Sequence, residues 1–234
     1  MKKSEKQGEI KLEITWLGQA GLLFETGKTK IIIAPYLSNS CQKVNPKSVR
    51  RYDVDESYLK IKPDVIILTH NHLDHTDPET LEHYLKNGGI TVLASENAWQ
   101  NVRTTGFENN YVMFNCGTEF TVNDITFKAV YAEHSDNRAI GVIFSAEEKN
   151  YYVTGDTLYS KKVFDSVKGK IDVVFLPING KGNNMNSVDA KRFCEKLKVK
   201  KAVPLHFGLF DDLNGKEFEF NNKFVPTPFK KIEI

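Results

Sequence analysis

The sequence contains one segment that is dense in metal-binding side chains, Thr69-His70-Asn71-His72-Leu73-Asp74-His75. It follows the apolar run 65–68, which is typical of a buried β-strand. A strand end is rigid and the loop after it can turn, so side chains placed there can converge on one point. Neutral imidazole nitrogens and carboxylate oxygens suit zinc, and also manganese or iron. The segment therefore predicts a metal site at the end of a strand.

Three further apolar runs are each followed by a potential ligand: His134 after residues 125–132, Asp156 after 151–154, and His206 after 202–205. A single His or Asp at a strand end is more often a cap or a solvated side chain than a ligand. That explanation fails for the group, because five of the six histidines follow predicted strands. We expect these side chains to bind metal together. The sixth, His83, lies within a predicted helix, and we expect it to be a bystander.

Short apolar runs rich in Val, Ile, Phe and Tyr recur between turn residues, which is typical of β-strands. We predict strands over residues 12–16, 22–24, 31–33, 65–68, 90–94, 125–132, 140–145, 151–154, 173–176 and 202–205. One helix should begin at Asp77-Pro78, a second after an N-cap at Ser187, and a third should cover 96–104. Because few helices separate the earlier strands, the pattern favours sheet packed on sheet with helices outside over a doubly wound parallel sheet.

Composition and charge restrict the partners that we expect. The 32 Lys and Arg residues against 30 Asp and Glu residues leave a formal net charge of +2, which does not by itself explain nucleic-acid binding. No apolar run approaches the roughly 20 residues that a membrane helix needs. We therefore expect a small-molecule substrate, no nucleic acid and no membrane segment.

The termini and the cysteines suggest organisation and compartment. We predict one domain over residues 10–234 after a disordered tail, residues 1–9. No apolar segment follows the charged N-terminus, and the three cysteines form no Cys-x-x-Cys pair, so we expect a cytoplasmic, reduced protein. Residues 225–229 and 232–234 could pack back on the domain or reach a neighbouring subunit of a homo-oligomer.

The pattern His70-x-His72-x-Asp74-His75, followed by His134, Asp156 and His206, resembles the metallo-β-lactamase superfamily. Further segments resemble the group typified by the bacterial L-ascorbate-6-phosphate lactonase: 16–21, 35–40, 132–135, 154–157, 177–180 and 204–208. The likeness extends from about residue 12 to about residue 210. It implies an α+β fold, a four-layer αββα sandwich with the site at one edge of the paired sheets.

The resemblance also implies a ligand set for two divalent ions, zinc or manganese. The first ion would take His70, His72 and His134, the second would take Asp74, His75 and His206, and Asp156 would bridge both. Ala34 departs from the family pattern, in which an Asp usually stands before the Pro-Tyr-Leu-Ser step. That Asp is expected to orient a ligand, so its absence should affect ligand orientation and metal affinity.

Two divalent ions can activate a bridging hydroxide for attack on a carbonyl carbon or a phosphorus. We expect hydrolysis of a small anionic lactone or ester, with Asp74 and Asp156 as the catalytic residues. Four polar side chains could hold the anionic group: Asn179, Lys181, Asn183 and Arg138. The alternatives are a phosphodiesterase acting on a lipid or nucleotide, and a metal-binding sensor without turnover. A redox di-iron role is disfavoured, because those relatives carry Glu at the position of His72.

Overall fold

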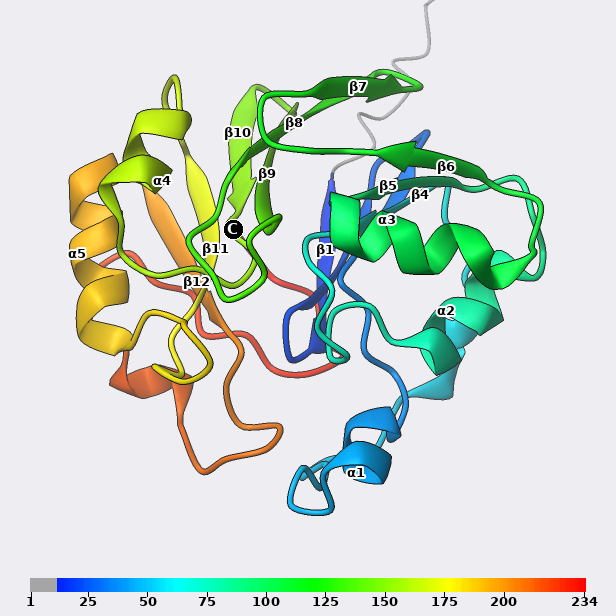
Figure 1. Cartoon of the computed structure of the whole chain (residues 1–234). Helices are drawn as coiled ribbons and strands as arrows, with labels where there is room; N and C mark the ends of the chain where they lie inside the picture. The colour runs from blue at the N-terminus through cyan, green and yellow to red at the C-terminus, as the bar shows by residue number, and fades with distance from the viewer. Residues whose placement is uncertain (1–11) are drawn as a thin grey trace, which may run out of the picture.

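Two six-stranded sheets face each other in the computed structural model, which describes residues 12–234 (Figure 1). The first sheet has the order β1-β2-β3-β4-β5-β6 and the second has the order β12-β11-β10-β9-β8-β7. The strands are β1 Glu13–Gly18, β2 Gly21–Glu25, β3 Lys30–Ile33, β4 Val65–Leu68, β5 Thr91–Ala94, β6 Asn110–Met113, β7 Glu119–Val122, β8 Ile125–Tyr131, β9 Ile140–Ala146, β10 Lys149–Val153, β11 Val173–Pro177 and β12 Lys201–Leu205. The predicted tail, residues 1–9, lies outside the described residues.

Each sheet is partly antiparallel and partly parallel. In the first sheet β1, β2 and β3 pair antiparallel, and β3 to β6 pair parallel. In the second sheet β7 to β10 are antiparallel, and β10, β11 and β12 are parallel. Parallel neighbours need long crossovers, so helices lie between them. The expectation of few helices between the earlier strands therefore holds only for the antiparallel parts of the sheets.

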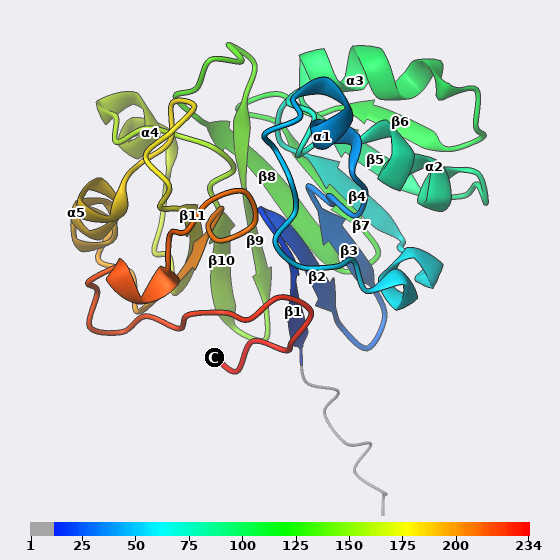
Figure 2. The ribbon, with the colours of Figure 1, turned by 90° about the horizontal axis from the view of Figure 1, so that it is seen from below.

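The helices form the two outer layers. They are α1 Ser40–Val44, α2 Pro78–Leu85, α3 Glu96–Val102, α4 Lys161–Ser166 and α5 Ser187–Leu197, with 3₁₀ turns η1 Glu56–Lys60, η2 Arg103–Thr105 and η3 Gly215–Glu217. Helices α2 and α3 cover the first sheet, and α4 and α5 cover the second (Figure 2). The predicted α+β fold with four αββα layers is confirmed.

Alternation along the strands produces the layered core. In β3, Ile31 and Ile33 belong to the apolar cluster between the sheets, whereas Ile32 belongs to the cluster under α2 and α3. The same alternation occurs in β4. Successive side chains of a strand point to opposite faces, so a run of apolar residues without polar positions marks a strand covered on both faces.

The predicted helices begin at the expected residues except at α5. Asp77 caps α2 by accepting hydrogen bonds from the backbone N–H of Glu79 and Thr80, and Pro78 is the first helical residue. In α5 the capping side chain belongs to Asn186, which accepts from Asp189 N, so the prediction of Ser187 as the N-cap was wrong by one residue. Asn and Ser are both good caps, and Asn186 has the extended backbone that the cap requires.

The C-terminal segment packs back along β1. The backbone N–H of Phe229 donates to Trp16 O at 2.7 Å, and that of Ile232 donates to Ile14 O at 2.7 Å. These bonds cover the free edge of the first sheet, and Ile232 is buried. Packing on its own domain is one of the two roles that the sequence left open for this segment. No helix among residues 12–234 is long and apolar enough to cross a membrane.

Candidate metal centre

Loops from both sheets bring the seven predicted ligands together. The segment His70–His75 follows β4 of the first sheet, and the second sheet supplies His134 after β8, Asp156 after β10 and His206 after β12. Ligand atoms of these residues form three groups, each with all its atoms within 4.8 Å of one another. The groups are His70, His72 and His134; His70, His75 and Asp156; and Asp74, His75 and His206. His83 is exposed on α2 and belongs to none of these groups of described residues.

The first group consists of three imidazoles. The ring centroids of His70, His72 and His134 lie 4.7 Å apart in every pair. His134 Nδ1 lies 3.2 Å from the backbone oxygen of Asn183. A carbonyl only accepts, so Nδ1 carries the proton and Nε2 offers its lone pair to a metal. The loop 177–186 therefore fixes the tautomer of His134.

The second group, which is Asp74, His75 and His206 together with the neighbouring Asp156, mixes imidazoles and carboxylates. His206 Nε2 lies 3.2 Å from Asp74 Oδ2 and 3.2 Å from Asp156 Oδ2. His75 Nε2 lies 3.3 Å from Asp156 Oδ1 and 3.8 Å from Asp74 Oδ2. Asn184 Nδ2 donates to Asp156 Oδ2 at 2.8 Å and holds that carboxylate in place. Asp156 is thus in contact with both imidazoles of the second group, and it also forms a group with His70.

Several buried polar atoms at the centre have no hydrogen-bond partner in the described part of the chain. His70 Nε2, both ring nitrogens of His75 and Asp156 Oδ1 are buried with no hydrogen-bond partner among residues 12–234. Buried polar groups nearly always have partners, so this concentration of orphaned imidazole and carboxylate atoms needs an explanation. Divalent cations would satisfy them, and their chemistry is that of zinc or manganese ligands. The donor set fits a metal centre.

Burial and neighbouring charges shift the imidazole pKa values of the two groups in different directions. Burial lowers the pKa of His70 well below its ordinary value, and burial also lowers the pKa of His134. Burial alone would lower the pKa of His206, but the carboxylates of Asp156 and Asp74 raise it well above its ordinary value. Burial alone would raise the pKa values of Asp156 and Asp74, but the neighbouring His75 and His206 hold both below the usual range.

Gln19 is a site residue that the sequence did not identify. It is buried in the turn between β1 and β2, and its Nε2 donates to Asp74 Oδ2 at 2.8 Å. Its backbone oxygen accepts from the backbone N–H of His206 at 2.9 Å. Gln19 thus connects two ligands of the second group. The available signal was a polar amide between glycines in an otherwise apolar turn.

The departure at Ala34 has a structural counterpart. A cavity of about 10 Å³ lies among Ala34, Thr69, His75 and Asp156, which is about the size of one water molecule. His75 Nδ1 is one of the atoms that has no partner in the described chain. Ala34 has φ 45°, a left-handed conformation that Asn and Asp adopt more readily than Ala. Position 34 therefore offers His75 no acceptor.

The four residues predicted to contact substrate differ in their exposure and in the groups that they contact. Lys181 and Asn183 are exposed in the loop that contacts His134, and Asn183 makes that contact with its backbone. Asn179 is half-buried, and its Oδ1 is buried without a partner among residues 12–234. Arg138 Nε lies 3.0 Å from Glu96 Oε2, so that acid partly neutralises its charge.

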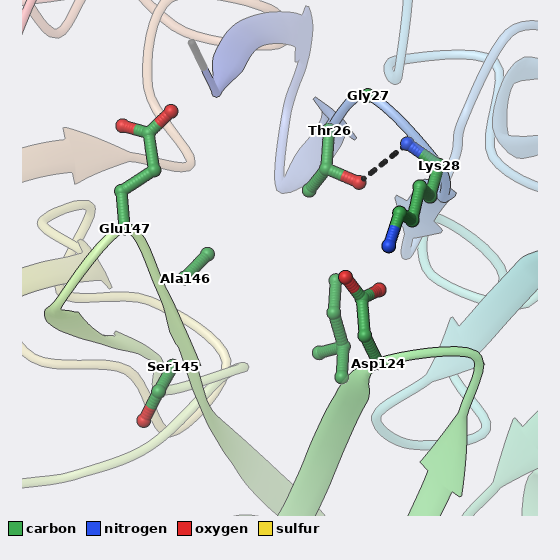
Figure 3. A pocket seen from close by; sticks show the side chains of 8 residues that line it. Thr26, Gly27, Lys28, Asp124, Ser145, Ala146 and Glu147 are labelled. Atoms are coloured by element: carbon green, nitrogen blue, oxygen red, sulfur yellow. Dashed lines mark hydrogen bonds between the residues drawn. The ribbon is translucent and has the colours of Figure 1, made fainter. Parts of the chain in front are cut away.

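A second cavity lies at the opposite end of β10. It has a volume of about 500 Å³ and is lined by Thr26, Gly27, Lys28, Asp124, Ile125, Ser145, Ala146 and Glu147 (Figure 3). Strand β10 starts at Lys149 beside this cavity and ends near Asp156. None of the seven predicted ligands is among its lining residues, so it is separate from the metal centre.

Comparison with known proteins identifies the family of the chain. A family model described as Beta-lactamase superfamily domain matches residues 13–206. A UPF0173 protein of Pyrococcus furiosus is 28% identical over 209 residues, which are 89% of this chain and 89% of the relative. A UPF0173 metal-dependent hydrolase of Bacillus cereus is 29% identical over 239 residues, covering 95% of this chain and 97% of the relative.

A solved structure shows the same fold. Igni18, a metallo hydrolase from the archaeon Ignicoccus hospitalis, aligns with a TM-score of 0.74 at 20% identity, covering 94% of this chain and 97% of Igni18. At this level of identity the likeness bears on the fold alone.

Proposed function

The chain belongs to the metallo-β-lactamase superfamily of metal-dependent hydrolases, and from that premise we propose that it uses two divalent ions to hydrolyse a small anionic lactone or ester. His70, His72 and His134 would hold one ion. Asp74, His75 and His206 would hold the other, with Asp156 shared. The observation that carries the proposal is the buried, unpartnered set of His70, His75 and Asp156 atoms at the junction of the two groups.

Divalent ions bound here would lower the pKa of water toward neutrality and polarise an oxygen of the substrate. The protein orients its ligands for this purpose through Asn183 O on His134, Asn184 on Asp156 and Gln19 on Asp74. Asp74 is the more exposed of the two acids, with 19% of its side chain accessible against 6% for Asp156. We assign to the Asp74 carboxylate a relay role: it would accept the proton that the attacking water loses and pass it on to the leaving group.

Substrate recognition is assigned to the loop 177–186 and its surroundings. Lys181 is an exposed cation in a loop that also contacts His134, so it can meet an anionic group beside the metal centre. Asn179, Asn183 and Arg138 complete the proposed set. Because Arg138 pairs with Glu96, we expect Lys181 to supply more of the attraction for the anion.

The test is hydrolysis by chelator-treated protein that has been reconstituted with zinc or manganese. The substrates are a panel of lactones, carboxylic esters and bis-p-nitrophenyl phosphate. We expect turnover of a lactone or ester that disappears on chelation and in His134→Ala. The matched control is His83→Ala, which removes the one histidine outside the centre and should keep full activity.

Two outcomes would replace this proposal. Turnover of the phosphodiester alone would make the protein a phosphodiesterase. Full metal occupancy without turnover of any substrate would favour a metal-binding sensor.

A further inference from the structure

Asp136 is a buried carboxylate that the proposed mechanism does not use. It is 9% exposed and follows the ligand His134 by two residues. Its Oδ2 accepts from the backbone N–H of Asn71 at 2.8 Å. Its Oδ1 accepts from Asn97 Nδ2 at 2.6 Å and from the backbone N–H of Arg138 at 2.9 Å. In the described part of the chain no cationic side chain lies within 4.0 Å of this carboxylate, since Arg138 turns to Glu96.

The bond to Asn71 joins two ligand loops that come from different sheets. Asn71 stands between the ligands His70 and His72, whereas Asp136 lies on the loop of His134. His72 Nδ1 and His134 Nε2 lie only 3.1 Å apart, so a small displacement of either loop would separate them. Hydrogen bonds to a charged acceptor are among the stronger ones in proteins. Asp136 therefore fixes the first sheet's ligand loop against the second sheet's loop.

Helix α3 supports this connection from outside. Asn97 donates to Asp136, and Asn101 Nδ2 donates to Asn71 Oδ1 at 2.8 Å. Both ends of the link between the loops are thus held by side chains of one helix. A carboxylate buried with amide donors alone also places a negative charge near the cluster, where it attracts a bound cation.

We propose that Asp136 positions the ligands of the first ion. It holds the loop of His72, from the first sheet, in a fixed position relative to the loop of His134, from the second sheet. The inference rests on the proposed function, because it requires that His70, His72 and His134 bind metal. Groups that orient metal ligands typically contribute 10- to 100-fold to metal affinity. Removing the charge of Asp136 should therefore weaken the binding of the first ion by about tenfold or more.

The experiment measures metal affinity in the full chain by competition with a chromophoric chelator, using zinc alone. Asp136→Asn keeps the size of the side chain but replaces one accepting oxygen with an NH₂ group. We expect zinc affinity to fall by about tenfold or more for the first ion. Asn97→Ala removes one donor to Asp136 and should cause a smaller loss. Asp165→Asn, at an exposed carboxylate paired with Lys161, is the control and should leave the affinity unchanged.

Cobalt(II) in place of zinc supplies a readout that a purely structural role would not move. The visible absorption of the first cobalt ion should change in Asp136→Asn while the near-UV circular dichroism of the metal-free protein stays the same. If Asp136→Asn does not fold, Asn97→Ala carries the test with the same measurements.

Unchanged zinc affinity and cobalt spectrum in the variants, with only a lower melting temperature, would overturn this inference alone. Absence of zinc binding by the unsubstituted chain would overturn the proposed function and this inference with it.

Discussion

The two ligand groups are built to different degrees of completeness. In the first group His134 has Asn183 O, His70 Nδ1 has Thr69 Oγ1 at 3.1 Å, and His72 Nε2 has Ser135 Oγ at 3.3 Å. In the second group Gln19 holds Asp74 and Asn184 holds Asp156, but His75 Nδ1 has no hydrogen-bond partner among residues 12–234. A ligand held by a partner is oriented before the metal arrives. The chain therefore orients the imidazoles of the first group more completely than His75 of the second group.

Backbone conformation and charge separate the groups further. Three residues other than glycine have positive φ around the second group, Gln19 at 50°, Ala34 at 45° and His206 at 59°, against one beside the first group, Asn183 at 63°. Such conformations cost energy and persist where the surrounding structure enforces them. The second group also includes carboxylates, whereas the first is all imidazole. We therefore expect the second ion to depend more strongly on pH and on position 34 than the first.

The largest effect should come from Asp156, because this residue is shared by both positions. Asp156→Ala removes the carboxylate that lies within 3.3 Å of His75 Nε2 and His206 Nε2. We expect weaker binding of both ions and a loss of turnover on the order of 10³-fold or more, as for other central catalytic acids. Metal analysis and steady-state kinetics check this. Retention of both metal and turnover would refute the shared role; Asp165→Ala, an exposed carboxylate, serves as control.

Single-ligand variants should separate the two positions. His134→Ala should remove the first ion, and His206→Ala should remove the second, so that each variant retains about one equivalent of metal. Each should lose at least ~100-fold in turnover, because the two ions act together. Anomalous diffraction at the metal edge would locate the remaining ion. If either variant loses both ions or neither, the groups are not separate positions.

A smaller effect, a gain in metal affinity instead of a loss, is expected from substitution of Ala34. Ala34→Asp should supply the acceptor that His75 Nδ1 lacks and fill the neighbouring cavity. We expect the second ion to bind about tenfold more tightly, while the first is unchanged. Ala34→Asn is the matched control, since it adds similar volume at the same backbone conformation without the charge and should gain less. Tighter binding of the first ion instead would contradict the link between Ala34 and His75.

The smallest expected effect is the release of a proton from His206 when metal binds. The pKa of His206 is raised, so in the metal-free protein its proton stabilises the fold below about pH 6.5, and this contribution is lost as pH rises through the raised value. Metal binds only the neutral imidazole. Filling the second position should therefore release one proton near pH 7. Its affinity should then rise about tenfold per pH unit over that range.

The first position should show much less pH dependence, because burial already keeps the pKa values of His70 and His134 low. Calorimetry in buffers of different ionisation enthalpy measures the released protons for each ion. Equal proton release from both positions would remove this difference between the groups.

The apolar runs predicted the ten strands that have a covered face, but not β6 and β7. These two strands carry only half-buried and exposed residues, so neither periodicity nor an apolar run marks them. Helices α1 and α4 are also absent from the predictions, since five or six residues are too few to show an apolar stripe. The strands lacked the signal of burial, and the helices lacked the length that would reveal a stripe.

The seven predicted ligands could be picked out because histidines and aspartates after strands form an unusual pattern, and the structure brings all of them together. Gln19, Asn184 and Asp136 could not, because each is a single polar residue whose role depends on which loop lies opposite it. That information is a property of the folded sheets. The empty acceptor position at Ala34 shows the same limit, since only the structure reveals that His75 Nδ1 has no partner in the described chain.

A calorimetric zinc titration of the metal-free protein, with an activity measurement at each step, tests the two-metal centre most directly. The proposed two-metal centre should bind two ions per chain in two resolved steps, the second of which depends on pH, with hydrolysis reaching its maximum when both positions are filled. One ion per chain, or hydrolysis that persists undiminished after complete removal of metal, would contradict it.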